Sequence, residues 1–345
     1  MPRLKAITAL LGLAAIAFAA IAAFEFYWLT PTEIFVTPRN VTIEKGESFR
    51  SVAHKLAAAG AVHSALAIQL YGQFTGTARR VKPGEYEFKG GERIREVMHH
   101  LVAGDFTVVT VVIPEGLAVH QIGERLEAAG LVCQGDFEDA ARDGPLVRAL
   151  GLMPLGAEGY LFPATYRFSP HASADQILFA MVSRFFRVLT PEVEARMFEL
   201  GLNTRQLVTM ASIVEREAKV SGERPLIAGV FYNRLKLGMQ LQSDPTAEYS
   251  FDGTVGAAAQ AVRTPSAFNT YEIAGLPPGP IASPGLKSIE AALYPAQSNF
   301  LYFVARDDGT HVFSKSFNDH KRAIVASSKA RRSNVARPLA AGRAD

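Results

Sequence analysis

The stretch that decides the N-terminal fold runs from Val112 to Val132 and reads VIPEGLAVHQIGERLEAAGLV. An extended apolar run is followed by a glycine at Gly116, then by an amphipathic segment that stops at a second glycine, Gly130. Tight turns and helix C-termini favour glycine, because it adopts positive φ at low cost. The pattern therefore predicts a strand, a turn and a helix that ends at Gly130.

The same pattern occurs earlier in the chain, at residues 42–62. Gly46 and Gly60 align with the two glycines of the later stretch, and Val52 aligns with Ile122, all at one constant offset. Self-similarity of this kind indicates a repeated structural unit.

Each copy continues in the same way. Residues 83–88 and 163–168 share the pattern Pro-x-x-Tyr-x-Phe and end in the period-2 alternation of a half-buried strand. Second helices are expected between the paired stretches, at 65–74 and 136–150. The sequence thus predicts two strand-helix-helix-strand units in tandem.

A strand-helix-helix-strand unit with glycine directly after its first strand resembles the LysM domain, a glycan-binding module. Residues 35–105 match it better than residues 106–170. The resemblance lies in topology more than in particular residues, so the unit is expected either to bind N-acetylated sugar chains or to act as a spacer.

The N-terminus is apolar. Residues 6–24 carry no charge and would span about 28 Å as a helix, close to the thickness of a hydrocarbon core. Arg3 and Lys5 precede this run, and by the positive-inside rule the N-terminus then stays in the cytoplasm and the body is exported. The alternative is a signal peptide cleaved after the small-x-small site at 20–22.

The composition excludes several classes of protein. The chain has 345 residues, of which 48% are hydrophobic and 20% charged, with a net charge of +3. These values are typical of globular domains, and the charge is too small to predict nucleic-acid binding. One cysteine, Cys133, allows no internal disulfide. Nucleotide-loop, zinc-protease and serine-hydrolase motifs are absent, so no cofactor or metal is expected.

A helix expected at 206–219 carries two acidic candidates. Its apolar residues form one stripe, and Glu215 and Glu217 lie about 200° apart on either side of that stripe. Either carboxyl could be partly desolvated, which would raise its pKa toward the range that a general acid needs. Periodicity alone does not choose between them.

A long irregular region follows, with motifs at 242–246, 268–271 and 275–281. Proline and glycine are too dense there for regular structure, and long ordered loops are usually functional. A helix is expected over 283–293, with Ser283 as N-cap and Pro284 in its first turn. A hairpin is expected within 300–314.

Seven spaced motifs together resemble one family, the YceG-like endolytic murein transglycosylases. In chain order they are EGYLFP (158–163), ASIVERE (211–217), FYNRL (231–235), QSDPT (242–246), NTY (269–271), GLPPG (275–279) and YFVA (302–305). The resemblance implies a single-pass inner-membrane protein of the bacterial envelope with a LysM-like portion. It also implies a periplasmic catalytic domain that cuts glycan strands of peptidoglycan, and peptidoglycan synthases as partners.

The family's catalytic glutamate corresponds to Glu215. The implied reaction uses no water: the C6 hydroxyl of N-acetylmuramic acid attacks its own C1 and leaves a 1,6-anhydro end. Glu215 would then act first as acid and afterwards as base. Gln242, Asp244, Asn269 and Tyr271 lie in motifs that line the cleft, and are expected to bind substrate.

Two alternatives remain at this point. A hydrolytic muramidase would use Glu215 as acid and Asp244 or Glu248 as base, because ordinary glycosidases need two carboxylates. A non-catalytic scaffold would bind glycan without cutting it.

The resulting prediction is an α+β protein. It consists of a cytoplasmic tip and transmembrane helix (1–30), a LysM-like domain (35–105), a second repeat-like unit (106–170), an α+β catalytic domain (171–325) and a disordered basic tail (326–345).

Overall fold

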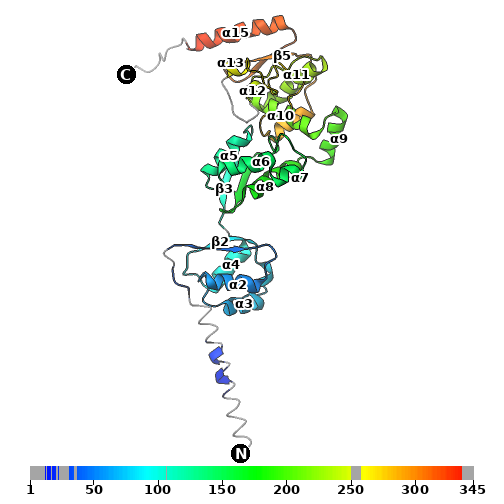
Figure 1. Ribbon diagram of the computed structural model, residues 1–345. Coiled ribbons are helices and arrows are strands. Elements are labelled where there is room, and N and C mark those ends of the chain that lie inside the picture. Colours follow the sequence, from blue (N-terminus) through cyan, green and yellow to red (C-terminus); the bar gives the residue numbers. More distant parts are fainter. Residues whose placement is uncertain are drawn as a thin grey trace, which may run out of the picture. The chain divides into compact units, whose positions relative to one another are not determined.

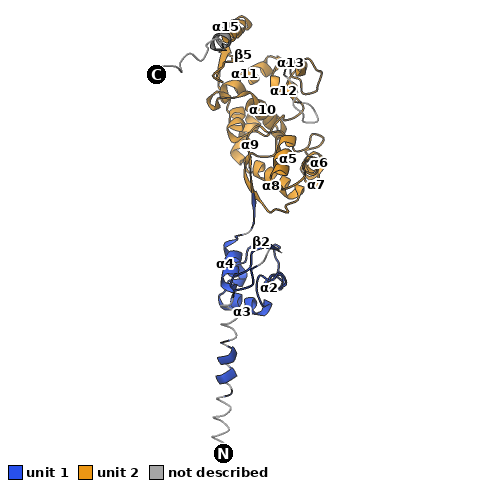
Figure 2. Cartoon of the chain, turned by 90° about the vertical axis from the view of Figure 1, so that its left-hand side faces the viewer, with its two compact units in different colours: residues 1–109 blue, residues 110–345 orange. Residues whose placement is uncertain are grey.

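The computed structural model describes residues 12, 14–16, 18–20, 22, 31–34, 37–105, 107–249 and 258–335. The chain divides into two compact units, Met1–Val109 and Thr110–Asp345 (Figure 2). None of the helices in these described stretches is long and apolar enough to cross a bilayer. The predicted anchor at 6–24 falls largely outside the described residues.

Unit 1 has the strand-helix-helix-strand order that its repeat predicts. The elements are β1 (Arg39–Ile43), α2 (Phe49–Ala58), α3 (Ala65–Phe74), the 3-10 turn η1 (Ala78–Arg80), β2 (Gly84–Phe88) and α4 (Ile94–Ala103). β1 and β2 pair antiparallel, with Val41 opposite Tyr86. Alternate residues of both strands are buried against Leu56, Ile68 and Leu101 of the helices, so unit 1 has its own core.

Unit 2 begins with a similar order of elements, in which two shorter helices replace the second helix. They are β3 (Val109–Ile113), α5 (Val119–Ala128), α6 (Gln134–Asp143), α7 (Pro145–Ala149) and β4 (Ala164–Phe168), and β3 and β4 form one two-stranded sheet. The single helix expected at 136–150 is instead two, because Gly144 is extended (φ −66°, ψ 167°) and Pro145 starts a new helix.

The remainder of unit 2 is mainly helical (Figure 1). Its elements are α8 (Ala174–Phe186), α9 (Pro191–Leu200), α10 (Thr204–Glu217), the turn η2 (Ser221–Glu223), α11 (Arg224–Lys236), α12 (Asp244–Glu248), α13 (Ala258–Ala261), α14 (Leu286–Leu293), the hairpin β5 (Tyr302–Ala305) and β6 (His311–Ser314), and α15 (Phe317–Val335). Helix α10 is central and packs against α11, α12 and α14.

The start of α14 differs from the prediction. The backbone of Ser283 exchanges two 2.8 Å hydrogen bonds with the turn after β3, one from Gly116 N–H and one to Leu117 O. This pairing holds Ser283 outside a helix, so Gly285 is the N-cap and the helix begins at Leu286. The same two bonds join the second repeat to the rest of unit 2.

The C-terminal segment also differs. The tail expected to be disordered from residue 326 is helical as far as Val335, where α15 ends. Ala, Lys and Arg, which are frequent here, are strong helix formers, and α15 packs against β5 and β6. Residues 336–345 lie outside the described residues.

Candidate active site

Helix α10 carries both acidic candidates in its last turn. The side chain of Asn203 caps its N-terminus by accepting a hydrogen bond from Gln206 N–H, and the side-chain oxygen of Gln206 accepts one from Asn203 N–H in return. Every residue from 207 to 214 is buried, so the helix runs through the core of unit 2. Glu215 and Glu217 follow where α10 leaves the core, and their surroundings differ completely.

Glu215 is engaged in an ion pair. Its Oε1 accepts a 2.8 Å hydrogen bond from Nη2 of Arg224, and its Oε2 accepts one from Gly285 N–H at 3.0 Å. The side chains of Glu215 and Arg224 are 6% and 10% exposed. Arg224 also donates to Ser288 Oγ and lies 3.7 Å from Glu115. Both Glu215 oxygens therefore have partners suited to a carboxylate, which connects α10 to α11 and α14.

Glu217 has the surroundings of a general acid. It is half-buried, and burial raises its pKa to about 7, assisted by the nearby carboxylates of Asp244 and Glu248. A 2.5 Å hydrogen bond from Ser243 Oγ–H acts in the opposite direction, because it stabilises the ionised form. A carboxyl with a pKa near 7 exists in both protonation states at neutral pH, as acid–base catalysis requires.

Asp244, which is exposed, and Tyr271, which is half-buried, form one wall beside Glu217. Tyr271 Oη–H donates a 2.6 Å hydrogen bond to Asp244 Oδ1. Burial and the Asp244 carboxylate both raise the pKa of Tyr271, so its hydroxyl stays protonated and acts as a donor. Two polar groups, one at the start of α12 and one in the loop between α13 and α14, are thus held together next to Glu217.

Gln242 occupies a strained position at the edge of this wall. It is exposed and has φ +50°, in the left-handed region that residues other than glycine seldom adopt. Its N–H donates to Thr270 O at 3.0 Å, and its Oε1 lies 3.4 Å from Nη1 of Arg234. Arg234 is buried and also donates to backbone carbonyls, including Leu241 O at 2.7 Å. These bonds hold the segment before Gln242 against the core.

Thr270 joins the QSDPT and NTY motifs. Its Oγ1 accepts a hydrogen bond from Ser243 N–H at 3.0 Å and lies 2.7 Å from Oγ1 of Thr246. All three residues are buried. This connection sets the position of Ser243, and through it the hydrogen bond to Glu217.

Asn269 is part of the scaffold of the site. Its side chain is fully buried. The amide nitrogen donates to the carbonyls of Val262 and Thr264, and the amide oxygen accepts from Tyr271 N–H at 3.1 Å. The amide is therefore occupied in shaping the loop that presents Tyr271, and this geometry argues against the expected direct contact with substrate.

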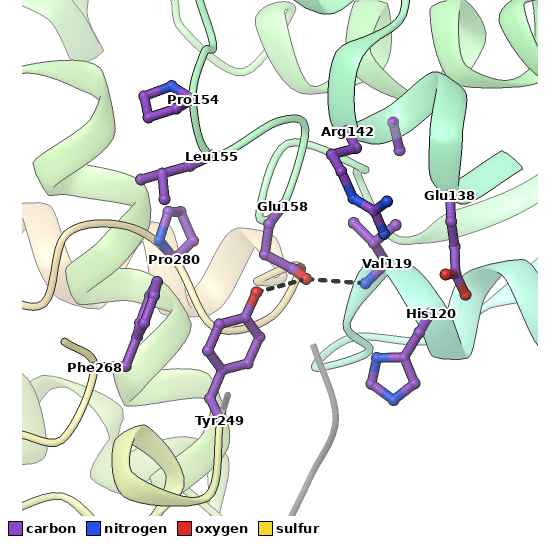
Figure 3. A pocket seen from close by; sticks show the side chains of 11 residues that line it. Val119, His120, Glu138, Arg142, Pro154, Leu155, Glu158, Tyr249, Phe268 and Pro280 are labelled. Atoms are coloured by element: carbon purple, nitrogen blue, oxygen red, sulfur yellow. Dashed lines mark hydrogen bonds between the residues drawn. The ribbon is translucent and has the colours of Figure 1, made fainter. Parts of the chain in front are cut away.

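A second buried carboxyl lies elsewhere in unit 2. Glu158 accepts hydrogen bonds from Val119 N–H, at the N-terminus of α5, and from Tyr249 Oη–H, at 3.1 and 3.3 Å (Figure 3). Burial raises its pKa to about 7. It lines a cavity of about 100 Å³ together with Phe268 and Pro280. Since Tyr249 ends α12, Glu158 connects the second repeat to the helix that carries Asp244.

The described part of the chain offers no evident metal site. Within it, His, Cys, Asp and Glu side chains form no group of three or more that could hold an ion. Asp244 and Glu248 lie near Glu217, and the effect assigned to them is electrostatic: both raise the pKa of Glu217.

Comparisons with known proteins agree with this architecture. The model of the YceG-like family matches residues 41–326. A protein named endolytic murein transglycosylase from Bacillus subtilis (strain 168) is 32% identical over 307 residues, covering 83% of this chain and 84% of that protein. A protein of the same name from Streptococcus pneumoniae serotype 2 (strain D39 / NCTC 7466) is 29% identical over 324 residues, covering 83% and 58%.

A solved structure shares the fold. The crystal structure of a YceG-like protein from Listeria monocytogenes gives a TM-score of 0.57 at 30% sequence identity, over 83% of this chain and 99% of that chain. The chain therefore belongs to the YceG-like family. The family resemblance seen in the seven motifs is confirmed.

The structure adds residues that the sequence did not single out. Of the residues predicted for the site, Gln242, Asp244 and Tyr271 lie on the wall beside Glu217, whereas Asn269 and Glu215 are held within the scaffold. Ser243, Thr270 and Arg234 were not predicted. Ser243 lies inside a quoted motif, but no pattern in the sequence indicates that it meets Glu217.

Proposed function

We propose that this chain is an endolytic lytic transglycosylase. It cuts the β-1,4 bond between N-acetylmuramic acid and N-acetylglucosamine within glycan strands of peptidoglycan and leaves 1,6-anhydro ends. Membership of the YceG-like family supports the proposal, as do relatives named endolytic murein transglycosylase.

One observation carries the assignment of the acid: the environment of Glu217. Its carboxyl is half-buried, has a pKa of about 7 and accepts a hydrogen bond from Ser243. We therefore assign the acid to Glu217 in place of Glu215, the residue expected from the resemblance. Glu215 is paired with Arg224 and Gly285 N–H, so it is not placed to supply a proton.

The proposed reaction needs one titrating carboxyl. Protonated Glu217 donates its proton to the glycosidic oxygen as the bond from C1 to that oxygen breaks. The C6 hydroxyl of the same muramic acid attacks C1, and the new bond from C1 to O6 closes the anhydro ring. Carboxylate Glu217 accepts the proton that O6 releases, which restores the acid. Intramolecular attack supplies the proximity that a separate nucleophile would otherwise provide.

Asp244 and Tyr271 are proposed to face the sugar. The Asp244 carboxylate favours protonated Glu217 before the reaction and stabilises positive charge that develops at C1. Tyr271 is positioned by Asp244 and offers an aromatic face for a sugar ring. Glu248 also contributes negative charge near Glu217.

Product analysis tests the reaction and its residue together. Full-length protein in detergent is incubated with uncrosslinked glycan strands, and the fragments are measured by mass spectrometry. We expect internal fragments with 1,6-anhydro ends from the wild type and from Glu215→Gln, if it is folded at the assay temperature, but none from Glu217→Gln. Cleavage by Glu217→Gln would overturn the assignment.

The end group separates the alternatives. Reducing ends that depend on both Glu217 and Asp244 would indicate a hydrolytic muramidase. Binding of glycan by folded wild type without any shortening of the strands would indicate a scaffold.

We also propose where the protein works. The charge-free run at 6–24, preceded by Arg3 and Lys5, supports a single-pass inner-membrane anchor with a periplasmic body. The topology of unit 1 supports a LysM-like glycan contact, and synthases of the membrane are the expected partners. Carbonate extraction of membranes tests the anchor: the full chain should remain in the pellet.

A further inference from the structure

Helix α3 of unit 1 exposes an apolar stripe. Leu66, Leu70 and Phe74, spaced i, i+4 and i+8, are 65%, 37% and 83% exposed. The opposite side of the helix is buried through Ile68 and Gly72. No residue of α3 is charged. Single exposed apolar residues are ordinary, but a continuous stripe on an uncharged helix is typical of a surface that meets a partner or a membrane.

The position of α3 in the chain indicates what the apolar stripe contacts. Nε2 of His63, next to the N-cap of α3, lies 3.1 Å from the carbonyl oxygen of Pro31. The apolar run of the sequence ends at Phe24, so the chain between Phe24 and Pro31 reaches at most about 25 Å. If that run is anchored, the start of α3 stays within this distance of the bilayer.

Charge complements the stripe. Arg79 and Arg80 lie in η1, directly after α3, and both are exposed. Basic residues beside an apolar stripe are characteristic of helices that lie in the interface of anionic membranes. If the apolar run is anchored, the bilayer lies at the end of unit 1 where the chain arrives from residue 31, which is the end that carries His63 and the start of α3.

We propose that the stripe of Leu66, Leu70 and Phe74 lies in the interface of an anionic phospholipid bilayer, with Arg79 and Arg80 at the headgroups. The proposal rests on the proposed anchor for the nearness of the membrane and does not depend on the catalytic assignment. Its consequence is that unit 1 is held against the membrane surface and does not swing freely on a tether.

Tryptophan fluorescence in vesicles tests the contact. Trp28, the single tryptophan of the chain, is changed to Phe, and one reporter is introduced, either Phe74→Trp or, as a matched control, Phe198→Trp. Phe198, in α9 of unit 2, is 87% exposed, so the two reporters start equally open to water. The full-length variants are reconstituted in phosphatidylglycerol-containing vesicles with brominated or ordinary acyl chains.

We expect the brominated lipid to quench Phe74→Trp and not Phe198→Trp. Adding Arg79→Glu and Arg80→Glu should weaken the quenching of Phe74→Trp, and unchanged quenching would overturn the electrostatic part of the proposal. An unquenched Phe74→Trp would overturn the membrane contact itself.

Carbonate extraction of the same vesicles is scored separately. If the protein resists extraction while Phe74→Trp is unquenched, the result supports the anchor and contradicts the membrane contact of α3. If the protein is extracted while Phe74→Trp is quenched, the result supports the membrane contact of α3 and contradicts the anchor. Protein that is extracted and unquenched contradicts both.

Discussion

Two glutamates, two positions apart on one helix, have opposite surroundings in this protein. Glu215 meets Arg224 and Gly285 N–H, whereas Glu217 meets Ser243 and two further carboxylates. Because about 200° of helical rotation separates them, they face different segments of the chain. A glutamate that is buried beside other carboxylates retains its proton more readily, as Glu217 does.

Glu215→Gln is expected to destabilise unit 2. Among the described residues, the change leaves Glu115, at 3.7 Å, as the acidic neighbour of the nearly buried Arg224, so the free energy of unfolding should fall by about 2–4 kcal/mol. Chemical denaturation measures it. Glu115→Gln is the matched control, because Glu115 is 46% exposed, and it should change stability by less than about 1 kcal/mol. Equal effects of the two changes would contradict this account of the ion pair.

The pH profile should report Glu217. Its acid form is required, so kcat/KM should fall about tenfold per pH unit above about pH 7. Ser243→Ala removes the donor that stabilises the carboxylate, and should shift this fall to higher pH. Asp244→Asn removes a charge that stabilises the acid, and should shift it to lower pH. Shifts in the same direction would show that the fall reports another group.

At the scale of elements, short segments are positioned by bonds between distant parts of the chain. Helix α12 begins at Asp244 and is held by Thr270 at one end and by Tyr249 with Glu158 at the other. A helix of this length is not stable alone, so these bonds determine where Asp244 lies relative to Glu217.

Glu158 should make stability depend on pH. Burial raises its pKa from 4.5 to about 7, so the stability that it contributes is present below about pH 4.5 and is lost as the pH rises through 7. Glu158→Gln keeps a side-chain oxygen that accepts from Val119 N–H, but the amide does not ionise. Between about pH 5 and 8 the wild type should lose on the order of 2 kcal/mol relative to this variant.

Denaturation at several pH values measures that loss. Tyr249→Phe is the matched variant: it removes a donor that lowers the pKa of Glu158, so the loss should be larger than in the wild type. A difference between wild type and Glu158→Gln that is constant with pH would contradict a titrating Glu158.

At the scale of the whole molecule, the two units have separate cores. Leu101 is fully buried in unit 1, among residues of that unit alone. Leu101→Ala should therefore lower the free energy of unfolding of unit 1 by about 2–5 kcal/mol. Differential scanning calorimetry should show the transition of unit 1 at lower temperature and that of unit 2 unchanged. Equal movement of both transitions would show that the units unfold together.

Much of the fold could be predicted from local pattern. The repeat predicted the strand-helix-helix-strand order of the first copy, and the helix expected at 65–74 has these bounds in the structure. In the second copy the prediction missed the break at Gly144, which divides the second helix into α6 and α7. The start of α14 could not be predicted in this way. Ser283 and Pro284 have the composition of a helix start, but the backbone of Ser283 is bonded to the turn at Gly116 and Leu117, which is remote in sequence.

The sequence by itself determined the family, the repeat and the helix on which both acidic candidates lie, because motif spacing and periodicity are properties of neighbouring residues. It did not determine which of the two glutamates has a cation as its neighbour and which has carboxylates. That depends on Arg224, Gly285, Ser243 and Asp244, which the fold brings to opposite sides of the end of α10. A pKa is set by burial and charge in three dimensions, so only the tertiary structure separates Glu217 from Glu215.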